Sequence, residues 1–185
     1  MAHSCVCSPA SSYAVPFLAY SFVPFVYHNR PGKSYPIIKK FVVDLRKNEA
    51  ADLPVGAAGF CWGGKHVVLL AGDEERVNGK PLIDAGYTAH PSMLTLPADI
   101  ENIKRPVSFA CAGTDHQLSP ELVQKIKTIV EEKPAEAKGE VVTFEGCGHG
   151  FAVRADLSNA DVSKQADAAE AQSIRWFNKH FGVSP

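Results

Sequence analysis

Apolar and polar positions along the chain alternate with a period that changes several times from residue 33 onward. Over 33–47, apolar residues recur at helical spacing with lysines between them, so a helix is expected there. Ser34 is a suitable N-cap for this helix, and Pro36 suits its first turn. A short apolar run at 55–60, bounded by turn residues, predicts a buried strand, and the run at 65–72 predicts a buried helix.

Further along, the same patterns predict three more strands, at intervals that leave room for helices: 82–90, 105–113 and 139–146. Two more helices are expected. The first, at 119–133, opens with Ser-Pro and places apolar residues on one face, namely Leu122, Ile126, Ile129 and Val130; the second, at 161–181, is rich in alanine and includes Ile174, Phe177 and Phe181. Strands that alternate with helices predict an α/β fold, with a mostly parallel sheet flanked by helices.

The N-terminal part follows none of these patterns. The apolar run at 13–27 is too short to span a membrane and is interrupted by Pro16 and Pro24. A secretory signal would open with a positive region, and only His3 precedes the run as a chargeable side chain. We therefore expect a buried or partly ordered leader at 1–32 and a single domain at 33–185.

Composition narrows the function classes. The chain has 185 residues, is 45% hydrophobic and 21% charged, and carries a formal net charge of -1, which is typical of a soluble globular protein. The absence of a dense basic cluster argues against a nucleic-acid partner, and no membrane partner is expected. Five cysteines cannot all pair with one another, so a reducing, cytoplasmic compartment is favoured.

Residues with catalytic chemistry follow three of the predicted strands. Cys61 comes directly after the first strand, Asp115 after the strand at 105–113, and His149 after the strand at 139–146. In parallel sheets, functional residues collect at the carboxyl ends of strands. The order nucleophile, acid, histidine is that of the α/β-hydrolase triad, and the Gly-x-Cys-x-Gly stretch at 59–63 has the spacing of its nucleophile elbow.

An elbow of this kind has a physical basis. A sharp turn from strand to helix brings backbone segments close together, and Gly59 and Gly63 would allow that approach. The backbone N–H of Trp62, at the start of the helix, could then stabilise a developing oxyanion. His149 would activate the thiol, and Asp115 would orient the imidazole.

The stretches "GFCWGGK", "AGTDHQLSP" and "GCGHGF", together with "AHPS" at 89–92, resemble the dienelactone hydrolase family over about residues 33–181. The resemblance implies an α/β-hydrolase fold with Cys61 as nucleophile, Asp115 as acid and His149 as base. It implies cleavage of cyclic esters by acyl transfer without a metal or cofactor, as in the opening of dienelactone to maleylacetate. It also places Arg154, one residue out of register, near an arginine that holds the substrate carboxylate in the type enzymes.

The resemblance further implies strands before the nucleophile strand, a loop that supplies a second oxyanion donor, and a glutamate that helps to ionise the cysteine. None of these is readable before residue 33, where there is room for one strand at most. We therefore expect a sheet that is incomplete on its N-terminal side, with an exposed edge that allows self-association.

Structural explanations compete with these assignments. Cys61 by itself could be a small buried hydrophobic residue, and Asp115 could cap the helix at 119–133. Cys147 lies close to His149 and, with Cys61, could suggest zinc, but structural zinc sites usually have two closely spaced ligand pairs and no second pair is present.

The other histidines and cysteines fit structural positions better than a site. His90 and His116 are expected to be structural or rim residues, and Cys111, in the middle of a strand, to lie in the core. Cys5 and Cys7 are expected to be incidental.

Two functions therefore remain. The first is a hydrolase of small ester or lactone substrates that uses a Cys-His-Asp triad and a thioester intermediate. The second is a truncated, non-catalytic relic of the fold that acts as a binding or redox-reactive protein.

Overall fold

The structure of the protein is a computed structural model, and it describes residues 14–156 and 158–183. Its contacts divide the chain into two compact units, residues 1–37 and 38–185. The second unit contains the sheet and all the candidate catalytic residues.

In the first unit, helix α1 (Ala14–His28) takes the place of the single strand for which the leader was expected to have room. The helix continues through Pro24, which lies within its span and removes only one backbone donor. The side chains described on this helix are mostly exposed rather than buried, with Tyr20 at 83% and Val23 at 61%.

Helix α2 (Pro31–Lys47) confirms the helical period but not its predicted start. The helix begins at Pro31, a favoured first position because proline lacks the N–H that would be left without an intrahelical acceptor. Ser34 therefore lies inside the helix, where its hydroxyl donates to the backbone oxygens of Asn29 and Arg30 instead of capping the first turn.

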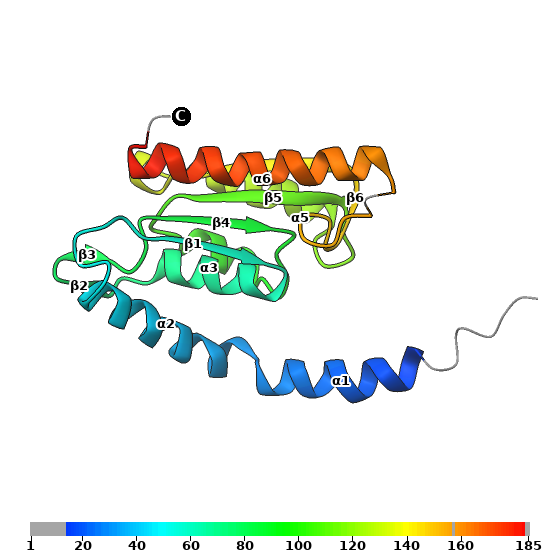
Figure 1. The fold of residues 1–185 in the computed structure, drawn as a ribbon, viewed down its shortest axis with the longest axis horizontal. Helices are drawn as coiled ribbons and strands as arrows, with labels where there is room; N and C mark the ends of the chain where they lie inside the picture. Colours follow the sequence, from blue (N-terminus) through cyan, green and yellow to red (C-terminus); the bar gives the residue numbers. More distant parts are fainter. Residues whose placement is uncertain (1–13, 157, 184–185) are drawn as a thin grey trace, which may run out of the picture. The chain divides into compact units, whose positions relative to one another are not determined.

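The second unit is built on a four-stranded, entirely parallel sheet in the order β1-β4-β5-β6, as the alternating pattern predicted (Figure 1). The strands are β1 (Gly56–Phe60), β4 (Ala85–Ala89), β5 (Val107–Thr114) and β6 (Glu140–Gly148). Helix α6 (Ala160–Phe181) packs against one face of the sheet, while α3 (Trp62–Gly72) packs against β1 and β4 on the other (Figure 1). Helix α5 (Pro120–Glu131) contacts β5 and β6.

Several small elements were not predicted: the hairpin of β2 (Arg76–Val77) and β3 (Lys80–Pro81), the short helix α4 (Ala98–Glu101) and the 3-10 turn η1 (Ala135–Ala137). The predicted apolar face of α5 was also partly wrong. Leu122 is exposed, and the buried side chains are Val123, Ile126 and Val130. Those three positions form a narrower stripe, which is the one that faces the sheet and its neighbours.

The core on the α6 side of the sheet is aromatic. Tyr87, Phe144, Phe151 and Trp176 form one buried cluster, and the Tyr87 hydroxyl donates to the backbone oxygen of Ala169. Cys111 is fully buried, as predicted.

Strand β1 lies at one edge of the sheet. It pairs with β4, and within the described residues no strand pairs with its other side. Phe60, at the end of β1, is 38% exposed. This is the exposed sheet edge expected from the sequence.

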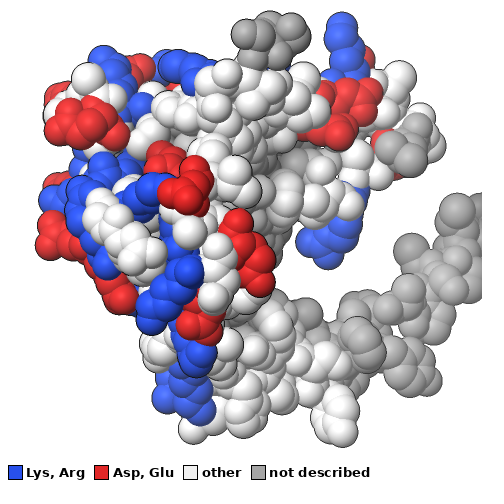
Figure 2. Space-filling model, turned by 60° about the vertical axis from the view of Figure 1, so that its left-hand side comes forward, with Lys and Arg blue, Asp and Glu red and all other residues white. Residues whose placement is uncertain are grey.

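Charged side chains of both signs are interspersed on the face shown in Figure 2. Neither sign forms an extended surface on that face, in keeping with a formal net charge of -1. None of the helices in the described ranges combines the length and apolar character that crossing a membrane requires.

Candidate active site

Cys61 lies at the turn between β1 and α3, where it occupies the N-cap position of the helix. Its φ of 52° is in the left-handed region, which non-glycine residues seldom adopt. The backbone N–H of Cys61 donates to the oxygen of Ala89, so the turn is anchored to the end of β4. Strained backbone of this type costs about 1–3 kcal/mol and persists only where the surrounding structure holds it.

Of the two glycines predicted to allow the sharp turn at Cys61, one is crowded and the other is not. A Cβ atom on Gly59 would lie 2.6 Å from the carbonyl carbon of Gly63 and 2.7 Å from Cγ2 of Val67, so the close approach expected there is confirmed. A Cβ atom on Gly63 would meet no described atom within 4 Å, so the crowding predicted at that position is absent. Gly64 is the second crowded position, since its Cβ would lie 2.8 Å from Pro91.

Three side chains that are far apart in the sequence meet at the carboxyl ends of β1, β5 and β6. Sγ of Cys61 lies 3.1 Å from Nε2 of His149. The other ring nitrogen, Nδ1, lies 3.0 and 2.9 Å from the two carboxylate oxygens of Asp115. The three side chains therefore form one continuous chain of hydrogen bonds from sulfur to carboxylate.

The carboxylate of Asp115 is fixed by its burial and by a second hydrogen bond, in addition to the one with His149. Its side chain is only 1% exposed, and Oδ1 also accepts a hydrogen bond from the backbone N–H of Gln117 at 2.8 Å. Helix α5 begins at Pro120 with Ser119 as its N-cap, so the alternative in which Asp115 caps this helix is wrong.

His90, which was expected to be a structural or rim residue, is buried beside His149 of the candidate triad. It is fully buried, with a φ of 39°, and its ring lies edge-on to that of His149 with the centroids 5.0 Å apart. Neither ring nitrogen has a hydrogen-bond partner in the described part of the chain. Burial, with a smaller contribution from the charge on His149, lowers the pKa of His90 from 6.5 to about 4.

This low pKa predicts a loss of stability in mild acid. Because the unfolded state binds a proton at this residue below about pH 6.5 and the folded state only below about pH 4, stability falls as the pH falls through that window. At about 1.4 kcal/mol per pKa unit, the loss from pH 7 to pH 4 is about 3 kcal/mol.

Urea unfolding of the wild type and of His90→Asn at both pH values measures this contribution. Asparagine tolerates a positive φ but does not titrate, so the variant should lose about 3 kcal/mol less than the wild type between pH 7 and pH 4. Parallel pH profiles for the two proteins would contradict the prediction.

Ser92 is a residue that was missed, although "AHPS" was noted as a motif. It is buried at 6% exposed, and its Oγ lies 3.6 Å from Sγ of Cys61. Its backbone N–H donates to the oxygen of Cys61 at 3.0 Å. No local pattern indicated this contact, because it depends on the pairing of β1 with β4.

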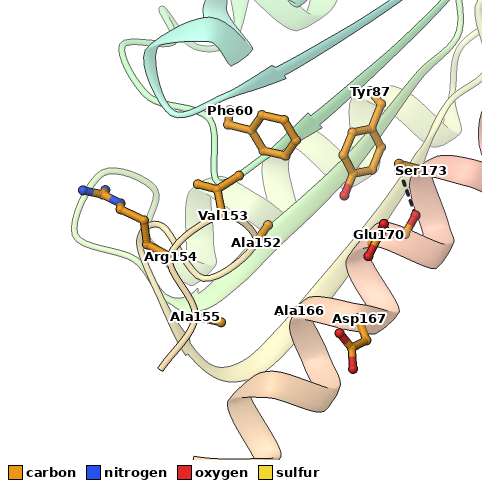
Figure 3. A pocket seen from close by; sticks show the side chains of 10 residues that line it. All are labelled: Phe60, Tyr87, Ala152, Val153, Arg154, Ala155, Ala166, Asp167, Glu170 and Ser173. Carbon is orange, nitrogen blue, oxygen red and sulfur yellow. Dashed lines mark hydrogen bonds between the residues drawn. The ribbon is translucent and has the colours of Figure 1, made fainter. Parts of the chain in front are cut away.

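A pocket of about 540 Å³ is lined by residues of β1, β4, α6 and the turn that follows His149 (Figure 3). Phe60 and Tyr87 come from β1 and β4, and Asp167 and Glu170 line the α6 side (Figure 3). Cys61, Asp115 and His149 are not among the residues that line it, but Phe60, which does line it, directly precedes Cys61 in the chain.

Arg154, for which a binding role was predicted, lies at this pocket in the turn that follows His149. The side chain is exposed, and a Cβ atom on Gly150 would lie 3.0 Å from its guanidinium, so the arginine passes close over the residue next to the histidine. The ring of Trp62, the first helical residue, packs against that of His66 at an interplanar angle of 49°, with the centroids 4.2 Å apart.

The remaining polar residues near the site are structural or lie at its rim. His116 is largely exposed, at 71% of its side chain, and contacts the His149 ring edge-on. Cys147 is fully buried, and burial raises the pKa of its thiol; burial raises the pKa of Cys111 to about 12. Cys5 and Cys7 lie outside the described residues.

Comparison with known proteins identifies similar sequences along most of the chain. The model of the dienelactone hydrolase family matches residues 27–181. The hydrolase tropI of Talaromyces stipitatus is 31% identical in an alignment of 148 residues that covers 78% of this chain and 53% of that protein. A carboxymethylenebutenolidase homologue of Mus musculus is 32% identical in an alignment of 130 residues that covers 68% of this chain and 49% of that protein. The chain thus spans about half the length of these curated relatives.

Solved structures share the fold at lower identity. A dienelactone hydrolase-like promiscuous phosphotriesterase from metagenomic libraries, P91, has a TM-score of 0.61 and 17% identity, covering 88% of this chain and 67% of that one. The carboxylesterase Cest-2923 of Lactobacillus plantarum has the same TM-score with 13% identity, covering 83% of this chain and 69% of its own. These likenesses support the α/β-hydrolase architecture of the sheet and helices.

Proposed function

Since the chain belongs to the dienelactone hydrolase family, we propose that it hydrolyses small ester or lactone substrates with Cys61 as nucleophile, His149 as base and Asp115 as the acid of a catalytic triad. One observation carries the proposal. The sulfur lies 3.1 Å from one ring nitrogen of His149, and the other nitrogen lies 2.9 Å from the buried carboxylate of Asp115. This is the geometry by which a base activates a nucleophile and is itself oriented by an acid.

The proposed reaction proceeds in two steps. Nε2 of His149 takes the thiol proton as Sγ attacks the ester carbonyl carbon, and the same proton then passes to the departing alkoxide oxygen, which leaves a thioester on Cys61. Water, deprotonated by His149, attacks the thioester carbonyl and releases the acid, while the proton returns to the thiolate. In a lactone the alkoxide and the acyl group remain one molecule, so a hydroxy acid, or its keto tautomer where the alkoxide is an enolate, is released.

Binding and oxyanion roles belong to the same proposal. The backbone N–H of Trp62 lies at the first residue of α3, where the helix end favours negative charge, and we assign it to the developing oxyanion. Arg154 is assigned to a substrate carboxylate, because it approaches the residue next to His149 and lines the neighbouring pocket.

The alternative is a non-catalytic binding or redox-reactive protein with the same fold. The edge at β1 with which no described strand pairs favours it. Turnover of a p-nitrophenyl ester separates the two functions, because catalysis requires a rate above that of Cys61→Ala.

Thiol labelling tests the nucleophile without a substrate. Iodoacetamide at neutral pH is expected to modify Cys61 before Cys111 and Cys147, since the latter two are fully buried with raised pKa values whereas Cys61 is partly exposed beside an imidazole. Peptide mapping by mass spectrometry gives the order of modification. Faster labelling of Cys111 or Cys147 in the folded protein would overturn the assignment.

A further inference from the structure

The contact between Ser92 and Cys61 has no place in the triad described above. Within the described residues, Sγ of Cys61 has two side-chain hydrogen-bond contacts, Nε2 of His149 at 3.1 Å and Oγ of Ser92 at 3.6 Å. Both are within the reach of hydrogen bonds to sulfur, which are longer than those to oxygen. Among the described residues, the sulfur of Cys61 is the hydrogen-bond contact of the Ser92 hydroxyl.

The backbone fixes this contact. The N–H of Cys61 donates to the oxygen of Ala89, and the N–H of Ser92 donates back to the oxygen of Cys61 at 3.0 Å. These two bonds continue the parallel pairing of β1 with β4 beyond the last paired residues, Phe60 and Ala89. Ser92 is therefore held beside the nucleophile by main-chain bonds on both sides of the elbow.

The loop that carries Ser92 has strained backbone on both sides of this residue. His90 and Met93 have φ values of 39° and 59°, both in the left-handed region. Each such residue costs about 1–3 kcal/mol, and strain of this kind collects at functional sites. The strained positions thus flank a buried hydroxyl that lies beside the sulfur of Cys61.

A hydroxyl in this position suits the charged form of the nucleophile. A thiolate can only accept hydrogen bonds, and a serine hydroxyl can turn its proton toward it while a neutral thiol requires no such donor. Hydrogen bonds to the charged form of a group favour that form. Burial of Ser92 at 6% exposed limits competition from water.

We propose that Ser92 is a further catalytic residue, whose hydroxyl donates to the thiolate of Cys61 and stabilises the pair that Cys61 forms with His149. The inference rests on the proposed function, because it assumes that Cys61 is the nucleophile. Ser92 keeps its own proton throughout: the thiol proton goes to His149, and when Sγ bonds to the acyl carbon the serine hydroxyl loses its anionic acceptor.

The test measures the pH dependence of Cys61 alkylation by iodoacetamide, with the modified peptide quantified by mass spectrometry. In Ser92→Ala, the inflection of the alkylation rate is expected to move upward by about one pH unit, so that the rate on the acidic side falls about tenfold. The rate at alkaline pH, where the thiol is fully ionised in both proteins, should change little.

Controls separate the hydroxyl from packing. Ser92→Thr keeps a hydroxyl and should retain the wild-type inflection, whereas Ser92→Val has the size of threonine and should behave like alanine. This pair carries the test if Ser92→Ala does not fold. Thr88→Val removes a different buried hydroxyl of β4, one with no hydrogen-bond partner in the described structure, and should leave the inflection unchanged.

The outcomes distinguish this inference from the proposed function. If His149→Ala shifts the alkylation profile but Ser92→Ala and Ser92→Val do not, the role of Ser92 is wrong and the triad stands. If His149→Ala leaves the profile of Cys61 unchanged, the triad itself is wrong.

Discussion

Replacement of Cys61 or His149 by alanine is expected to remove almost all hydrolysis of a p-nitrophenyl ester, by about 10⁴-fold or more in kcat. The sulfur and the ring nitrogen are 3.1 Å apart, and the proposed mechanism has them act on the same proton, so neither would function without the other. The double variant should therefore be no slower than either single variant by more than a small factor.

Asp115→Asn provides a graded comparison. The carboxylate accepts hydrogen bonds from Nδ1 of His149 and from the backbone N–H of Gln117. Because it exchanges no atom with the substrate in the proposed mechanism, its loss should cost less than loss of Cys61 or His149. Steady-state rates for all four variants at equal protein concentration test the set. If the losses of kcat in Cys61→Ala and His149→Ala multiply in the double variant, the two residues do not share a mechanism. A wild-type rate equal to that of Cys61→Ala would favour the non-catalytic alternative.

The second large effect concerns the elbow itself. Gly59→Ala is expected to destabilise the protein by about 3 kcal/mol or more, because the new methyl group would collide with backbone atoms of Gly63 and with Val67. The obstructing atoms belong mainly to the main chain of α3, so a side-chain rotation cannot relieve the collision. Relief requires movement of the helix start, which would also displace Cys61.

Gly63→Ala is the matched control, since a methyl group there meets no described atom within 4 Å. Because alanine is favoured over glycine in helices by up to about 1 kcal/mol, this variant should be as stable as the wild type or slightly more stable. Urea unfolding monitored by circular dichroism compares the two variants. Equal stabilities for Gly59→Ala and Gly63→Ala would show that the elbow is not crowded as described.

The sequence by itself determined the fold class and the order in which the candidate nucleophile, acid and base follow one another along the chain. Local patterns were sufficient for this, because hydrophobic period distinguishes strand from helix and because glycine, proline and cap residues mark their ends. The runs at 55–60, 105–113 and 139–146 became β1, β5 and β6 within a few residues, and Cys61, Asp115 and His149 each follow one of them. The general rule that such residues collect at strand ends then predicted one site.

The tertiary structure decided the contacts that depend on which strands are neighbours. Since β4 lies between β1 and β5, the loop after β4 passes directly beside Cys61. The hydroxyl of Ser92 therefore lies within hydrogen-bond reach of the Cys61 sulfur, and the buried ring of His90 packs against that of His149. Packing also decided which glycine is indispensable: Gly59 is crowded by α3, whereas Gly63, which the same motif contains, is not. A motif records residue types and spacing along the chain, but the crowding and burial of each residue depend on atoms contributed by distant segments, which only the folded chain brings together.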